Sequence, residues 1–141
     1  MRLKSNERKR SALNEMIYED VNRAILKSHV GIVLIDSMCA FTTQDFMIMK
    51  QVLERGKALV IAANKWDLVD VKYRAKAVKW MEKQLNKNFG FTKEIGMLYV
   101  SARSGLRSAK VMDEVLRVYE KWNTRVSTNL LNKWLTAFKR V

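Results

Sequence analysis

Two short apolar runs constrain the fold of this chain more than any other feature. Val30–Ile35 and Ala58–Ala63 are continuous and rich in β-branched side chains, without the polar alternation of a half-exposed strand. Such runs are typical of strands buried on both faces, as in parallel sheets. Met97–Val100 is a third, shorter run. The sequence predicts three strands, the first two covered on both faces.

Apolar residues recur at helical spacing outside these runs, from about residue 11 to 28 and in four later segments, which predicts five helices. Thr42–Asp45 has the pattern of a capping box for a helix that Gly56 ends, and Asp70 is placed to cap the next helix. The last helix is expected at about Thr128 to Phe138. The apolar residues expected to face inward are Leu13, Ile17, Val21, Ala24 and Ile25; Phe46, Met49, Val52 and Leu53; Ala75, Val78, Met81 and Leu85; Met112, Val115, Tyr119 and Trp122; Leu130, Leu131, Trp134, Leu135 and Phe138.

Strands that alternate with helices favour right-handed crossovers and a parallel sheet. The expected order is one helix, three strand-helix pairs and a final helix. Three strands are few for this architecture, because doubly wound sheets usually have about five or six. We therefore expect an α/β fold that is part of a larger sheet, with a segment preceding Met1.

The composition narrows the class of partner. The 141 residues include 27 lysines and arginines and 14 acidic residues, and the net charge of +13 favours salt-dependent binding of phosphate backbones. Cys39 is the one cysteine, which excludes an internal disulfide. The longest apolar runs span about seven residues, and a membrane helix needs roughly 20, so we expect no membrane partner.

The positive charge is unevenly distributed. Residues 30–64 hold three cations and three anions, whereas residues 65–93 hold eight cations and three anions. Four of these lysines share one face of the helix after the second strand, beside Trp80. The candidate RNA-binding residues are Lys72, Lys76, Lys79 and Lys83, with a second patch of Lys133, Lys139 and Arg140. The alternative is a solvated outer face of an amphipathic helix.

Two loops carry the residues most specific for chemistry. Ligands of open α/β sheets bind beyond the carboxyl ends of the strands. Residues 64–67, Asn-Lys-Trp-Asp, follow the second strand, and residues 101–103, Ser-Ala-Arg, follow the third. The Asn-Lys-x-Asp pattern resembles the guanine-recognition motif of small GTP-binding domains. This resemblance implies that the Asp67 carboxylate accepts both neighbouring donors of the guanine edge, which adenine lacks. The alternative is a polar loop in which Asp67 or Asp70 caps a helix.

Three other residues complete this interpretation. Asn64 can reach acceptors on the purine edge and also tie neighbouring loops together. The aliphatic stem of Lys65 can lie over the base plane. Asp36 ends the first strand, where we expect a loop or capping role. The sequence indicates no catalytic residue and no metal ligand.

These motifs resemble the second GTPase domain of the EngA/Der ribosome-assembly GTPases, from about Asn22 to Phe138. The resemblance rests on Val21–Ile25, Val33–Asp36, Thr43–Asp45, Asn64–Leu68 and Ser101–Ala102, and the stretch Arg125–Asn132 is similar to the one that leads into the KH-like domain of the family. It implies GTP or GDP as ligand, with the Ala102 amide donating to the guanine carbonyl oxygen, Ser101 in the same loop and Arg103 covering the base.

The sequence departs from the family in two motifs. It contains no Gly-x-x-x-x-Gly-Lys-Ser/Thr to cradle phosphates and no Asp-x-x-Gly for Mg²⁺ and the γ-phosphate. We therefore expect residues 1–123 to be the carboxyl-terminal part of a P-loop-NTPase-like G domain whose P-loop half is absent. Residues 124–141 are expected to be a linker and the first helix of a KH-like domain. Mg²⁺ would bind only where the missing half is present.

The resemblance implies that the chain is part of a GTP-binding ribosome-biogenesis factor. The expected partners are rRNA of the large ribosomal subunit precursor and the missing G-domain half. Because phosphoryl transfer depends on the P-loop, its Lys and Mg²⁺, we expect no useful GTP hydrolysis by the chain alone. One alternative is a degenerate relative that acts only as a basic RNA-binding or scaffold element. Another is an unrelated basic α/β protein. The basic character favours a mitochondrial or plastid matrix over a bacterial cytoplasm.

Overall fold

The computed structural model describes residues 19–90 and 94–138, and the parts of the predictions that fall on other residues, Leu13 and Ile17 among them, lie outside it. Residues 19–27 are helical, as expected for that part of the first predicted helix. The elements that follow are β1 (Val30–Asp36), α2 (Thr43–Glu54), β2 (Ala58–Asn64), the short 3-10 helix η1 (Trp66–Leu68), α3 (Val71–Phe89), β3 (Gly96–Tyr99), α4 (Lys110–Trp122) and α5 (Thr128–Phe138). The predicted order and the parallel α/β class are confirmed.

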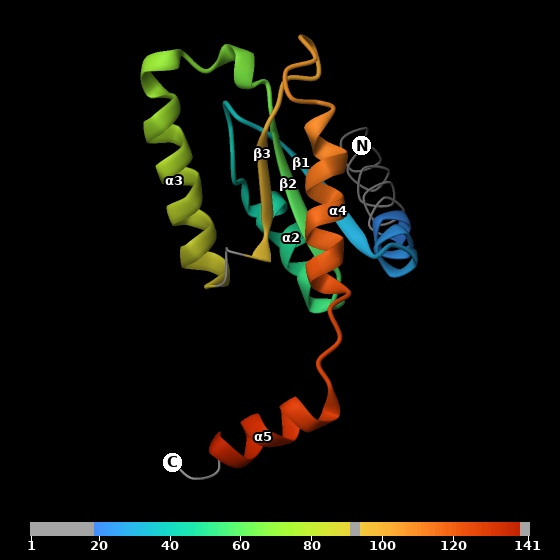
Figure 1. Ribbon diagram of the computed structural model, residues 1–141. Helices are drawn as coiled ribbons and strands as arrows, with labels where there is room; N and C mark the ends of the chain where they lie inside the picture. The colour runs from blue at the N-terminus through green and yellow to red at the C-terminus, as the bar shows by residue number, and fades with distance from the viewer. Residues whose placement is uncertain (1–18, 91–93, 139–141) are drawn as a thin grey trace, which may run out of the picture.

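The three strands form one parallel sheet in the order β1-β2-β3. Val30 pairs with Ala58 at one end and Asp36 with Asn64 at the other, so β1 and β2 end together. Gly31 permits a close approach of α2, since a Cβ there would lie 2.9 Å from Cγ1 of Val52. The register therefore brings the loops after the strands to one edge of the sheet (Figure 1).

The predicted caps set the helix boundaries. Thr42 and Asp45 form the expected reciprocal capping box at the start of α2. Gly56 follows the last turn of that helix with a φ of 66°, in the left-handed region that glycine adopts at little cost. The Asp70 side chain accepts the Lys72 N–H at 3.0 Å and caps α3.

Helices cover the two faces of the sheet unequally. The helix at residues 19–27, α2 and α3 pack on one face in a single apolar cluster, which includes Ile25, Met49 and Met81. On the other face, α4 packs through Val118 and Val115 against Ala58, Val60 and Val30 (Figure 1). That second cluster is smaller, because α4 is the helix that packs there within the described residues, whereas three helices pack on the first face.

The predicted burial of β1 on both faces is wrong for one face. Val33 and Ile35 are buried, but Ile32 and Leu34 on the other face are 48% and 62% exposed. β1 lies at the edge of the sheet, and α4 packs against it at Val30, so Ile32 and Leu34 further along the strand remain uncovered. A continuous apolar run indicates that both faces of a strand are suited to burial. It does not show which helices cover either face.

Some helix residues expected to face inward are also exposed: Ala24, Ala75, Met112, Trp122 and the apolar residues of α5, namely Leu130, Leu131, Trp134, Leu135 and Phe138. The buried residues of α3, Met81 and Leu85, lie in its second half, so its first turns extend past the core. In α4 the buried position is Val118, which turns Met112 outward. Helix α5 lies away from the sheet (Figure 1).

Candidate guanine-binding site

The loop after β2 is held in place by a buried tryptophan. Lys65 has a φ of 62°, and this left-handed residue turns the chain from the strand into η1. Trp66 is 3% exposed, and its ring centroid lies 4.4 Å from that of Tyr99. The backbone N–H of Trp66 donates to the Val100 carbonyl at 3.0 Å. The tryptophan therefore anchors a short loop whose next residue, Asp67, faces solvent.

Asp67 is available to a ligand. Its side chain is exposed, and within residues 19–90 and 94–138 its carboxylate has no hydrogen-bond or ion-pair partner. The alternative that it caps a helix is wrong, because that role belongs to Asp70. A free carboxylate on a rigid turn can accept two parallel N–H donors, the arrangement that a guanine edge requires.

Asn64 joins the two predicted loops. Its Oδ1 accepts the backbone N–H of Ala102 at 2.9 Å across 38 positions of sequence. The tie predicted for Asn64 is therefore present, and its side-chain NH₂ remains to face a purine acceptor. The Ala102 N–H already donates to Oδ1 of Asn64. A guanine oxygen can therefore accept from this N–H only in a bifurcated bond shared with Asn64 or after replacing Asn64 as the acceptor.

The loop after β3 is ordered from within. Ser101 is fully buried, its Oγ accepts the Ser104 N–H at 3.2 Å, and its own N–H donates to the Leu106 carbonyl at 3.1 Å. Ala102 and Arg103 are exposed next to this buried anchor. Ser101 thus acts in the structure as a scaffold for the loop, whereas the side chain of Arg103 is free to lie against a planar ligand.

Asp36 belongs to this site, which the sequence interpretation missed. Its Oδ2 lies 2.5 Å from Nζ of Lys65, and its Oδ1 accepts the Met38 N–H at 2.9 Å. The hydrogen bond from Lys65 and then that from Met38 hold the pKa of Asp36 below its usual value, and Asp36 in turn raises the pKa of Lys65. The pairing of Asp36 with Asn64 in the sheet could have indicated this contact.

The lysine face predicted on α3 is present. Lys72, Lys76, Lys79 and Lys83 are all exposed, and Trp80 beside them is 46% exposed. Lys72 alone of these has described partners, Asp70 at 3.4 Å and the Tyr73 ring at 4.8 Å from its centroid. In the second patch Lys133 is exposed on α5, while Lys139 and Arg140 lie outside the described residues.

Metal-ligand clusters and membrane-crossing helices are both absent from the part of the chain that the structure describes. Over residues 19–90 and 94–138, no group of three or more His, Cys, Asp or Glu side chains could hold a metal ion. In the same part of the chain, no helix has the length and apolar character needed to cross a membrane.

The three-stranded parallel sheet with flanking helices is consistent with part of a P-loop-NTPase-like G domain. The family model described as elongation factor Tu GTP binding domain matches residues 17–121, and the chain belongs to this family. Within the family it is of the EngA/Der type, as the sequence resemblance predicted.

Curated relatives named GTPase Der support the assignment to the EngA/Der type. The chain is 36% identical over 125 residues to the protein from Mesorhizobium japonicum, covering 89% of the chain and 26% of that protein. It is 30% identical to the Rickettsia prowazekii protein (89% of the chain, 28% of that protein) and to the Rickettsia rickettsii protein (91% and 30%). The chain therefore spans less than a third of the length of these relatives.

Proposed function

We propose that the chain recognises the guanine base of GTP or GDP as part of a ribosome-assembly GTPase of the EngA/Der type. Asp67 accepts the two neighbouring donors of the base, while Asn64 contacts the purine edge and keeps the two loops together. Lys65, held by Asp36, covers one side of the base, and Arg103 covers the other. The observation that carries the proposal is the exposed Asp67 carboxylate, which has no partner among the described residues and lies beside loops joined by the Asn64–Ala102 bond.

Base contacts alone provide weak binding. Phosphate groups are usually held by glycine-rich loops and helix N-termini, and the Gly-Lys-Ser/Thr motif for this is absent from the 141 residues. We expect the chain alone to bind GTP weakly and not to hydrolyse it at a useful rate. Sub-micromolar, Mg²⁺-dependent binding in a titration with fluorescent GTP contradicts this expectation.

The base assignment is tested by Asp67→Asn in the presence of a phosphate-binding half of a G domain. An amide cannot accept both guanine donors, so preference should shift from guanine to xanthine nucleotides by about two orders of magnitude. Asp70→Asn is the matched control, because asparagine still caps α3 and the residue lies three positions away. Competition between GDP and xanthosine diphosphate measures the preference, and an unchanged ratio in Asp67→Asn refutes the assignment.

We further propose that the chain associates with rRNA of the large ribosomal subunit precursor through the lysine face of α3, with Lys133 as an additional contact. Lys76, Lys79 and Lys83 are exposed and have no described acidic partner, so they can release counterions on binding a phosphate backbone. The absence of a base-reading motif favours recognition of backbone and shape.

Co-sedimentation with large ribosomal subunits at several salt concentrations tests this proposal. Replacing Lys79 and Lys83 by Glu should weaken binding and lower the slope of log affinity against log salt by about two. Replacing Lys27 and Lys50 by Glu changes the net charge equally on other exposed helices and should leave that slope nearly unchanged. Equal losses in both pairs indicate non-specific attraction and refute a defined lysine face.

A degenerate relative that binds RNA without nucleotide is the second candidate, favoured by the same lysine face together with the absent phosphate motif. The two candidate functions differ in one expected outcome. For the degenerate relative, Asp67→Asn should leave every measured property unchanged. We place the protein in a mitochondrial or plastid matrix because of its charge of +13. Recovery in a cytosolic fraction, away from organelles, contradicts that placement.

A further inference from the structure

Two large aromatic side chains on α3 are exposed beside the lysine face. Tyr73 is 57% exposed and Trp80 is 46% exposed, although proteins on average bury most of the surface of such rings. Seven residues make nearly two helical turns, so the two side chains lie on the same side of α3, about 10 Å apart along its axis. Helix α3 forms one flank of the molecule (Figure 1), which leaves this side open to a partner.

Lysines interleave with the two rings. Lys76 follows Tyr73 by three positions and precedes Trp80 by four, and Lys83 follows Trp80 by three. Residues three or four apart are neighbours on a helix surface, so aromatic and cationic side chains alternate along one stripe of α3. Lys76 and Lys83 are exposed, and neither has an acidic partner among residues 19–90 and 94–138. The stripe therefore combines flat apolar rings with positive charges that are free to bind an anion.

The ring of Trp80 is supported on one side. Its centroid lies 6.0 Å from that of Phe41, and the Phe41 ring stacks on Phe46 of α2 with 5.1 Å between centroids. These contacts restrict the orientation of the indole, so little conformational freedom is lost when a flat partner stacks on it. On Tyr73, Nζ of Lys72 already lies 4.8 Å from the ring centroid. Trp80 is therefore the stronger of the two platforms.

We propose that this stripe binds unpaired RNA, with one base stacked on Trp80, another on Tyr73, and the phosphates beside Lys76 and Lys83. This inference rests on the proposed association with rRNA and names the kind of RNA that the lysine face accepts. Bases inside a duplex are stacked on one another, whereas every unpaired base has a π-face to offer. Stacking uses no hydrogen-bonding edge of the base, so the site should show little sequence preference.

The aromatic rings separate this partner from other polyanions. The carboxylates of an acidic polypeptide would pair with the lysines but gain little from two flat rings between them. A duplex would likewise contact the lysines through its phosphates alone. A single strand uses both kinds of side chain in the stripe, because its phosphates and its bases are accessible together.

The test compares binding of the full chain to a labelled single-stranded RNA of mixed sequence and to the same sequence as a duplex, by fluorescence anisotropy. Trp80→Ala should weaken single-strand binding about tenfold and change duplex binding less than about twofold, because it removes a stacking partner and no charge. Trp80→Phe keeps a ring and should restore most of the loss. Met112→Ala is the matched control, since Met112 is 58% exposed on α4, the helix on the opposite face of the sheet, and this variant should bind both RNAs like the wild type.

Two further readouts distinguish stacking from charge. The slope of log affinity against log salt should be the same in Trp80→Ala and the wild type, whereas replacing Lys79 and Lys83 by Glu should lower it by about two. The chain has four tryptophans, and the fluorescence quenching by single-stranded RNA should fall in Trp80→Phe to the level that the duplex produces. Tyr73→Ala removes a ring that has no ring contact among the described residues, so it tests stacking even where Trp80→Ala lowers the thermal midpoint.

The outcomes separate the stacking site from the lysine face. Unchanged single-strand affinity in both Trp80→Ala and Tyr73→Ala, equal losses for single strand and duplex, or competition by polyglutamate as strong as by single-stranded RNA each overturns the stacking inference. If the salt slope still depends on Lys79 and Lys83, the lysine face stands without it. Failure of the wild type to bind either RNA refutes both.

Discussion

Removal of the Asn64 side chain tests whether one hydrogen bond joins the two halves of the candidate base site. In Asn64→Ala the Ala102 N–H loses its acceptor, a bond of 2.9 Å between residues 38 positions apart. Such a bond contributes about 1 kcal/mol when its groups can also reach water, as they can at this exposed position. The exchange protection of the Ala102 amide should therefore fall about fivefold.

Asn64→Asp separates this tie from the contact with the base. A carboxylate still accepts from the Ala102 N–H, so protection of that amide should stay near the wild-type value or rise. Aspartate lacks the NH₂ group, however, so any contact with a purine acceptor is lost. The expected pattern is a weakened tie in Asn64→Ala alone and weakened guanine binding in both variants.

Amide exchange followed by NMR measures the tie at the Ala102 amide, with the Ser101 amide as an internal reference, because its acceptor is the Leu106 carbonyl. Protection of Ala102 that is equal in the wild type and Asn64→Ala shows that the bond contributes nothing, and the reasoning fails. Equal loss of protection at both amides shows instead that the substitution loosens the whole loop, which also contradicts a specific tie.

Three further predictions concern pKa values and packing. Asp36→Asn should lower the pKa of Lys65 toward its ordinary value, and NMR titration of the Lys65 side chain checks this. In the wild type, the Asp36 contribution to stability should be lost as pH falls through the depressed folded pKa of Asp36, which NMR titration of that side chain checks. Burial raises the pKa of Tyr99 to about 12, so stability should decrease as pH rises from about 10 to about 12, and Tyr99→Phe should remove that dependence in alkaline denaturation. Gly31→Ala should destabilise the fold by about 1–3 kcal/mol in urea denaturation, because its Cβ meets Val52 at 2.9 Å, and Val52→Ala in the same chain should relieve part of the cost.

Local sequence signals predicted the elements of the fold because their causes are local. The capping box at Thr42 and the cap at Asp70 act within four residues of themselves, and both are present. Strand type followed from the β-branched runs, since a continuous apolar strand suits a parallel sheet. The position of the Asn64–Asp67 loop was also predictable, because strand ends in such sheets place polar loops at one edge.

Contacts that depend on tertiary register were missed or incomplete. Asp36 faces Lys65 because β1 and β2 end together, and no local pattern around Asp36 encodes that alignment. The family resemblance predicts that the Ala102 amide donates to a ligand, whereas in the structure it donates to Oδ1 of Asn64. In both cases two loops far apart in sequence share a hydrogen bond, and only the paired strands determine which atoms meet.

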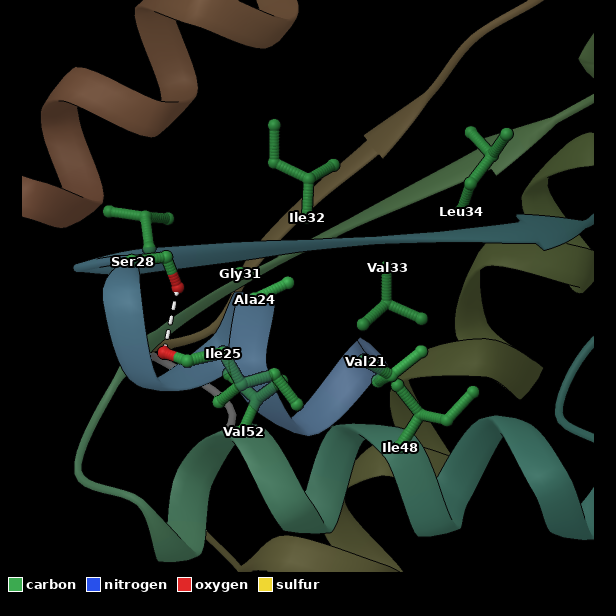
Figure 2. A pocket seen from close by; sticks show the side chains of 11 residues that line it. Val21, Ala24, Ile25, Ser28, Gly31, Ile32, Val33, Leu34, Ile48 and Val52 are labelled. Carbon is green, nitrogen blue, oxygen red and sulfur yellow. Dashed lines mark hydrogen bonds between the residues drawn. The ribbon is translucent and has the colours of Figure 1, made fainter. Parts of the chain in front are cut away.

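The error on β1 carries information of its own. The Val30–Ile35 run suits burial on both faces, but Leu34 is 62% exposed on one of them. Exposed apolar side chains in a contiguous patch usually mark an interaction site. Within residues 19–90 and 94–138, β1 is an outer strand of the three-stranded sheet, and an apolar pocket flanks it (Figure 2). The failed burial prediction therefore has a tertiary cause: the run has the composition of an inner strand, but its place at the margin of the sheet leaves Ile32 and Leu34 without a covering helix.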